Sequence, residues 1–105
     1  MRTISAGELH RMQARGDHFL ILDVREPYEV EECSIGGTCL PMGDLLDHLD
    51  EIPRDLPVVV HCHSGRRSSA VVDTLSTRYG FNNLMQLTGG ILAYEAEAKP
   101  AMNRA

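Results

Sequence analysis

The sequence predicts an α/β fold in which a central parallel sheet of about four to five strands carries helices on both faces. Short apolar stretches typical of buried strands alternate along the chain with stretches of helical spacing. No linker or internal repeat interrupts this alternation. Because 105 residues with 43% hydrophobic content suffice for one core, we expect a single domain over residues 1–105.

A capping box and an apolar run define the first elements. Ser5 and Glu8 have capping-box spacing, which predicts a helix that ends near Gly16. Residues 19–24 are mostly apolar and predict a buried strand. Because proline favours the first position of a helix, Pro27 predicts a short helical turn after this strand.

The middle of the chain contains a short strand and a helix. Residues 38–40 predict the strand, and Pro41 ends it. Asp44 is a residue type that caps helices, and the leucines after it predict a helix that reaches Ile52.

Strand and helix signals alternate twice in the second half of the chain. Three consecutive valines at 58–60 predict a buried strand. Apolar residues at helical spacing predict a helix from Ser68 to a stop at Gly80. Residues 84–87 predict the last strand, and a final helix is expected after the glycine pair at 89–90.

Cys62 is the strongest candidate for a catalytic residue. It lies between the valine strand and the next helix, where backbone N–H groups and the positive end of a helix dipole favour a thiolate. The charges of Arg66 and Arg67 are expected to lower its pKa further. A buried structural cysteine is the alternative, because cysteine is often a core residue. The two adjacent arginines favour the catalytic interpretation, since an inert core cysteine has no need of them.

The segment after Cys62 predicts an anion-binding loop. Consecutive backbone N–H groups that turn inward bind an oxyanion or a negatively charged sulfur atom. The expected substrate-binding residues are His63, Ser64, Gly65, Arg66, Arg67 and Ser68. For Ser68, capping of the helix and donation to a bound anion both remain open.

Asp23 and Arg25 are expected to support this loop. Both follow a strand, and the carboxyl ends of parallel strands meet at one edge of a sheet, so they should lie near Cys62. We favour a buried ion pair that orders the surroundings of the loop over direct contact with a substrate.

The histidines beside the nucleophile do not predict a metal site. A closed zinc site needs about four ligands, and His61, Cys62 and His63 supply too few. We expect His61 to be a packing residue. His63 as a proton shuttle or substrate contact is the minor alternative.

Cys33 and Cys39 are expected to occupy ordinary positions. Cys39 alternates with apolar residues and is assigned to the core. Cys33 could be exposed and resolve a persulfide on Cys62, but the neighbouring acids raise the pKa of a thiol and argue against this role. The acidic run at 26–32 predicts a solvated face, with a docking surface for a basic partner as the alternative.

The overall charge excludes some partners. A net charge of −5, from 15 acidic and 10 basic residues, argues against general binding to nucleic acid or anionic membranes. No segment approaches the roughly 20 apolar residues that a membrane span requires. Three cysteines without a Cys-x-x-Cys pair suggest no disulfide framework. We therefore expect a cytoplasmic protein with reduced thiols.

Three segments resemble the rhodanese family in the same order along the chain. Residues 62–68 resemble its active loop, Cys-x-x-Gly-x-Arg-Ser, at every fixed position. Residues 23–29 resemble its Asp-Val-Arg-Glu segment, and residues 89–94 its Gly-Gly-helix signature. Two departures concern packing and docking: residues 33–37 lack the Gly-His-Ile form, and Tyr94 stands where the family often has Trp.

This resemblance implies a sulfurtransferase of the thiosulfate:cyanide type. The Cys62 thiolate would attack the outer sulfur of thiosulfate or of a persulfide donor, and sulfite or a thiol would leave. A ring of loop amides would hold the resulting persulfide. Cyanide, a thiol or a protein cysteine would then accept the sulfur, and this chemistry requires no metal or organic cofactor.

Two other functions remain open. Cysteine-dependent phosphatases and arsenate reductases use a similar loop, in which five residues separate the cysteine from an arginine. Here Ser68 follows the five residues, so the loop is one residue short, and a smaller ring suits one sulfur atom better than a phosphate. The third class is a non-enzymatic sulfur carrier or binding module, which the basic loop around Cys62 disfavours.

Overall fold

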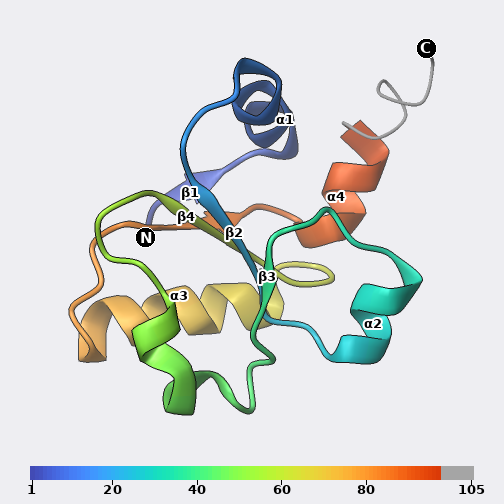
Figure 1. The fold of residues 1–105 in the computed structure, drawn as a ribbon. Coiled ribbons are helices and arrows are strands. Elements are labelled where there is room, and N and C mark those ends of the chain that lie inside the picture. Colours follow the sequence, from blue (N-terminus) through green and yellow to red (C-terminus); the bar gives the residue numbers. More distant parts are fainter. Residues whose placement is uncertain (98–105) are drawn as a thin grey trace.

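The computed structural model describes residues 1–97 and shows an α/β fold (Figure 1). Five strands form one sheet in the order β1-β5-β4-β2-β3, and every neighbouring pair is parallel. The elements in chain order are β1 (Thr3–Ile4), α1 (Ala6–Arg15), β2 (Leu20–Asp23), α2 (Pro27–Glu32), β3 (Thr38–Cys39), the 3-10 helix η1 (Leu45–Glu51), β4 (Val58–His61), α3 (Arg66–Arg78), β5 (Leu84–Leu87) and α4 (Gly90–Glu97). None of the helices within the described range has the length and apolar character needed to cross a membrane.

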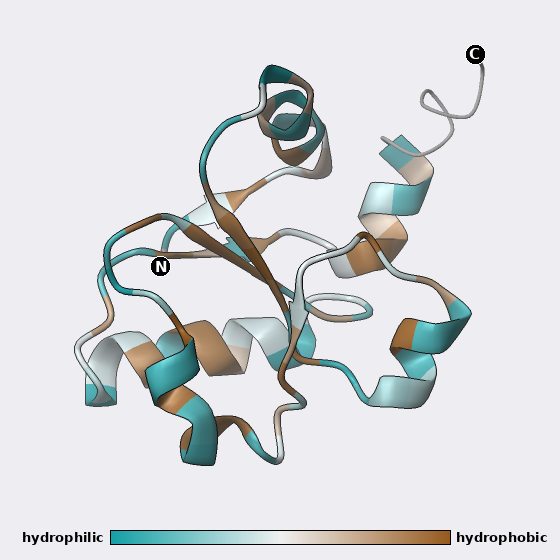
Figure 2. Ribbon diagram, viewed as in Figure 1, coloured by the Kyte–Doolittle hydropathy of each residue, from teal (hydrophilic) through white to brown (hydrophobic). Residues whose placement is uncertain are grey.

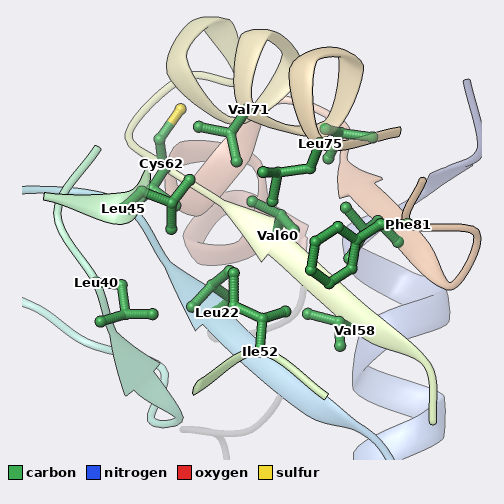
Figure 3. Packing of buried hydrophobic residues seen from close by; sticks show 13 residues of the cluster. Leu22, Leu40, Leu45, Ile52, Val58, Val60, Cys62, Val71, Leu75 and Phe81 are labelled. Atoms are coloured by element: carbon green, nitrogen blue, oxygen red, sulfur yellow. The ribbon is translucent and has the colours of Figure 1, made fainter. Parts of the chain in front are cut away.

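Helices cover both faces of the sheet, as predicted. On one face, α3 and η1 pack through residues such as Leu75 and Leu45 against the central strands (Figure 3). On the other face, α1 and α4 pack through Leu9 and Tyr94. Two separate apolar clusters therefore lie between the sheet and the described helices, one on each face.

The three valines of β4 pack against helices on both faces of the sheet. Side chains alternate between the faces of a strand, so Val58 and Val60 contribute to the cluster beneath α3 while Val59 contributes to the cluster beneath α1. All three side chains are fully buried. The hydropathy colouring shows the same apolar centre in the strands, with polar segments gathered on the surrounding helices and loops (Figure 2).

Local signals placed several elements correctly. The Ser5 hydroxyl accepts the Glu8 N–H at 3.1 Å, and the Glu8 carboxylate accepts the Ser5 N–H at 3.1 Å, which completes the predicted capping box. Helix α1 ends at Gly16, as expected. Strand β1 was not predicted, because its two residues are too few to show a period.

Two predicted helices differ from the structure in detail. Asp44 is the N-cap of the segment that begins at Leu45, as predicted, but its side chain makes no capping hydrogen bond, and the segment is a 3-10 helix with a non-helical residue at His48. Helix α3 begins at Arg66 rather than at Ser68, with Gly65 as its N-cap. A glycine in the left-handed conformation starts the helix directly after the turn, two residues before the apolar periodicity becomes visible.

The register of β2 and β4 brings the candidate residues to one edge of the sheet. Asp23 at the end of β2 lies beside His61 at the end of β4. The Val24 N–H continues the pairing by donating to the His61 carbonyl at 3.1 Å. The segments that follow both strands, including Cys62, therefore leave the sheet side by side.

Candidate active site

The loop between β4 and α3 folds around the sulfur atom of Cys62. The residue is 1% exposed. The N–H groups of Gly65 and Ser68 point at its Sγ, at 3.1 Å and 3.3 Å. The hydroxyl of Ser68 lies 3.5 Å from the same atom. Backbone N–H donors of the loop thus converge on one sulfur atom, and the binding of an anion by this loop stays a prediction.

Hydrogen bonding lowers the pKa of Cys62 although the thiol is buried. Burial by itself raises the pKa, because it disfavours the charged form. Hydrogen bonds from the Ser68 hydroxyl and from the N–H groups of Ser68, Gly65 and Arg67 outweigh that effect. The Arg67 charge also interacts with the thiolate. The Ser68 hydroxyl and the backbone donors of the loop, more than the charges of the two arginines, therefore favour the thiolate.

Gly65 permits the tight turn that starts this loop. Its φ of 108° lies in the region that only glycine adopts readily. A Cβ at this position would lie 2.9 Å from Nε2 of Gln86. Both the backbone conformation and the close approach of Gln86 therefore require glycine here.

Gln86 on β5 supports the loop from the sheet, and sequence reasoning missed it. The residue is 7% exposed, and its Nε2 donates to the Gly65 carbonyl at 3.2 Å and to the Ser68 hydroxyl at 3.3 Å. The same nitrogen also reaches the Leu87 carbonyl at 3.0 Å. The available signal was one polar residue inside the apolar run 84–87.

Ser68 does not cap α3, which corrects one of the two alternatives left open for it. Gly65 is the N-cap, and Ser68 lies in the first turn of the helix. Its hydroxyl donates to the Gly65 carbonyl at 3.3 Å and accepts from Gln86. This buried hydroxyl therefore links the sulfur, the turn and the sheet.

Helix α4 holds the other side of the loop. The N–H groups of Ile91 and Leu92 donate to the carbonyls of Cys62 and His63, at 2.9 Å and 3.1 Å. A Cβ on Gly90 would lie 2.6 Å from both of these carbonyl oxygens. The glycine pair at 89–90 thus lets the first turn of α4 bind the loop carbonyls.

Asp23 and Arg25 form the expected buried ion pair. Arg25 donates from Nε to Oδ1 of Asp23 at 3.0 Å and from Nη2 to Oδ2 at 2.8 Å. Both side chains are 3% exposed. Arg25 also donates to the carbonyls of Glu29 and Cys33, at 3.3 Å and 2.7 Å. The pair therefore ties helix α2 to the end of β2.

Arg67 is bound to Glu29 by a two-point ion pair. Nη1 donates to Oε1 at 2.7 Å, and Nη2 donates to Oε2 at 2.9 Å. This pairing is the main reason why the pKa of Glu29 falls to about 2. Glu29 also accepts the Glu26 N–H at 3.0 Å, at the start of α2. The acidic run at 26–32 is therefore not a wholly solvated face, because Glu29 is turned towards the loop.

The histidines and the remaining loop residues differ in exposure. His63, Ser64 and Arg66 are exposed. His61 is fully buried, with Nε2 3.6 Å from Oδ2 of Asp23, and burial lowers its pKa. His61 is therefore a neutral packing residue, as expected. Residues 1–97 contain no group of three His, Cys, Asp or Glu side chains suited to a metal ion.

A groove of about 350 Å³ lies beside the loop, between α2 and α4. Cys33 lines this groove and is half-buried, with its thiol donating to Oε1 of Glu95 at 2.9 Å. Cys39 is also half-buried, and burial raises its pKa. Cys39 is thus less enclosed than a core position, and Cys33 is less exposed than the sequence suggested.

The rhodanese-like domain family model matches residues 5–97. A sulfurtransferase of Allochromatium vinosum is 32% identical over 98 residues, covering 92% of this chain and 91% of its own. An adenylyltransferase and sulfurtransferase of Drosophila pseudoobscura pseudoobscura is 30% identical over 95 residues, and the match spans only 21% of that protein. A rhodanese-related protein of Thermoplasma volcanium has a TM-score of 0.83 at 32% identity, covering 93% of this chain and 94% of that structure. The chain belongs to the rhodanese-like domain family.

Proposed function

We propose that this chain transfers sulfane sulfur from thiosulfate or a persulfide donor to a thiophilic acceptor through a persulfide on Cys62. One observation carries this proposal: the buried Sγ of Cys62 receives the N–H groups of Gly65 and Ser68, at 3.1 Å and 3.3 Å. Membership of a family with relatives named sulfurtransferase supports it. We propose residues 1–105 as one functional domain, working in the cytoplasm where thiols stay reduced.

The first half-reaction forms a bond between Sγ and the outer sulfur of the donor. As this bond forms, the S–S bond of thiosulfate breaks, and its electron pair leaves with sulfite. The negative charge of the thiolate moves to the new terminal sulfur. Backbone N–H groups fixed around the loop stabilise that charge without reorganisation.

The second half-reaction removes this terminal sulfur. Cyanide, a thiol or a protein cysteine attacks it, and Sγ leaves as the thiolate with which the cycle began. Thiocyanate is the product when cyanide accepts. In this scheme Cys62 is the nucleophile, residues 63–68 bind the donor, and Asp23 and Arg25 support the loop. No step needs a metal or organic cofactor.

The geometry favours sulfur transfer over phosphate chemistry. Phosphatase loops of this kind use an arginine side chain after five residues to bind phosphate, and here Ser68 stands at that position. The preceding residue, Arg67, directs its guanidinium at Glu29. Turnover of an aryl phosphate that Cys62→Ser abolishes would favour the phosphatase alternative.

Incubation with thiosulfate, followed by peptide mass spectrometry, tests the proposal. We expect the mass of one sulfur atom on the peptide that contains Cys62, and its loss when cyanide is added. Cys62→Ser should abolish thiocyanate formation, whereas Cys33→Ser and Cys39→Ser should retain most of it. Retention of a tenth of the rate in Cys62→Ser would rule out the assigned nucleophile. Loading without repeated turnover would instead indicate a sulfur carrier.

A further inference from the structure

The arginines near the loop are already bound to carboxylates. Arg25 and Arg67 line the groove beside the loop. Arg25 is paired with Asp23, and Arg67 is paired with Glu29. A guanidinium whose donors are held by a carboxylate attracts a second anion far less than a free one does. Neither side chain therefore offers the groove an uncompensated positive charge.

Further acidic side chains line the same groove. Glu29, Glu32 and Glu95 contribute three carboxylates against the two guanidinium groups. Among residues 1–97, neither Glu32 nor Glu95 forms an ion pair. The groove next to the nucleophile is therefore net negative, although the loop sequence beside it is basic.

A negative groove favours some sulfur donors over others. Thiosulfate is a dianion, and its sulfonate charge must approach the loop together with the outer sulfur. The sulfane sulfur of a persulfide carries at most one negative charge. Because repulsion grows with the charge of the donor, the groove penalises thiosulfate more than a persulfide.

We propose that Glu29 is a specificity-determining residue, which neutralises Arg67 and thereby makes the site prefer persulfide donors over free thiosulfate. This inference rests on the proposed sulfur transfer. In the preferred reaction the Cys62 thiolate bonds to the terminal sulfur of R–S–SH. The S–S bond of the donor breaks, and its electron pair leaves with the thiolate R–S⁻, so Cys62 becomes the persulfide Cys62–S–SH.

Glu29→Gln tests this assignment with little change in shape. The glutamine amide oxygen still accepts the Glu26 N–H, so the start of α2 is kept. At low salt we expect kcat/KM for thiosulfate to rise about fivefold or more, because Arg67 then presents an unpaired charge. With cysteine persulfide as donor, kcat/KM should change less than about twofold. The matched control is Glu31→Gln, which changes an exposed residue of α2 outside the groove. It should leave unchanged the donor ratio, which is kcat/KM for thiosulfate divided by kcat/KM for cysteine persulfide.

The salt dependence of the unaltered protein gives a second readout that needs no variant. Between about 20 mM and about 500 mM salt, kcat/KM for thiosulfate should stay constant or rise, because screening removes a repulsion. A steep fall would show that the site attracts the dianion and would overturn the inference. An unchanged donor ratio in Glu29→Gln would also overturn it and would leave the proposed function intact. Absence of transfer from both donors in the unaltered protein would overturn the proposed function itself.

Discussion

The side-chain amide of Gln86 donates to the carbonyl of Gly65 at 3.2 Å and thereby fixes the loop after Cys62 to the sheet across 21 positions of sequence. The same nitrogen lies 3.3 Å from the Ser68 hydroxyl, which in turn lies 3.5 Å from the Cys62 sulfur. A strand residue that does not contact the sulfur in the described structure therefore sets the position of two residues that do. We infer that Gln86 is a positioning residue for the proposed sulfur transfer.

Replacing Gln86 with leucine should weaken both the fold and the reaction. The change keeps the volume but leaves the Gly65 carbonyl without its amide partner in a buried site. We expect the free energy of unfolding to fall by about 1–3 kcal/mol, measured by denaturant titration. We also expect kcat/KM for sulfur transfer to fall, because the loop after Cys62 is no longer fixed to β5. Met85→Leu, the neighbouring residue of β5, is the control and should change both quantities little. Unchanged unfolding and activity in Gln86→Leu would contradict the positioning role.

Gly90→Ala should displace the loop. The added Cβ would lie 2.6 Å from the carbonyl oxygens of Cys62 and His63, at a backbone φ of 60° that favours glycine. We expect a loss of roughly 1–3 kcal/mol in stability together with most of the sulfur transfer. Gly43→Ala provides the matched control, because no atom lies within 4 Å of its added Cβ. Equal activity of the two variants would show that the contact with α4 is unimportant.

Ser68→Ala should shift the pH profile of sulfur transfer to higher pH. Hydrogen bonds to the thiolate lower the pKa of Cys62, and the Ser68 hydroxyl supplies one of them by turning its proton from the Gly65 carbonyl to Sγ. Without it the pKa rises, so the thiolate forms at higher pH and the rising limb of kcat/KM moves upward. Ser69→Ala, which changes the next residue of α3, should keep the original profile. A profile that moved to lower pH in Ser68→Ala would contradict the assigned direction.

The ion pair between Glu29 and Arg67 should stabilise the fold at neutral pH and lose this effect in acid. The pKa of Glu29 falls from 4.5 to about 2 on folding, so the stabilisation is complete above about 4.5 and disappears as the pH approaches 2. Because the Arg67 side chain is 35% exposed, we expect only about 1 kcal/mol at pH 7 after allowance for solvent screening. The free energies of unfolding of the unaltered protein and of Glu29→Gln, measured by denaturant titration, should therefore converge as the pH falls from about 4.5 towards 2. A difference in this free energy that stayed constant with pH would show that the carboxylate charge does not cause it.

Residues close to one another in sequence were sufficient to predict several helices, strands and local contacts of the fold. The capping box of Ser5 and Glu8 lies within one turn of helix, so neighbouring residues specify it. The valines at 58–60 predict a strand buried on both faces, and Cys62, the proposed nucleophile, follows this strand at the carboxyl edge of the sheet. Asp23 and Arg25, two residues apart, form their ion pair through local geometry as well. These features depend on short spacings, which a sequence displays directly.

Only the tertiary structure decided which groups surround the Cys62 sulfur and the groove beside it. Glu29 and Arg67 are 38 positions apart, and Gln86 reaches Gly65 across 21. Each partner is an ordinary polar residue in its own segment, and nothing in its neighbours indicates the pairing. The order of strands in the sheet brings β5 beside β4, and the packing of α2 and α4 encloses the groove. The charge presented to a donor is thus a property of long-range packing, because it depends on which carboxylate meets which guanidinium in space.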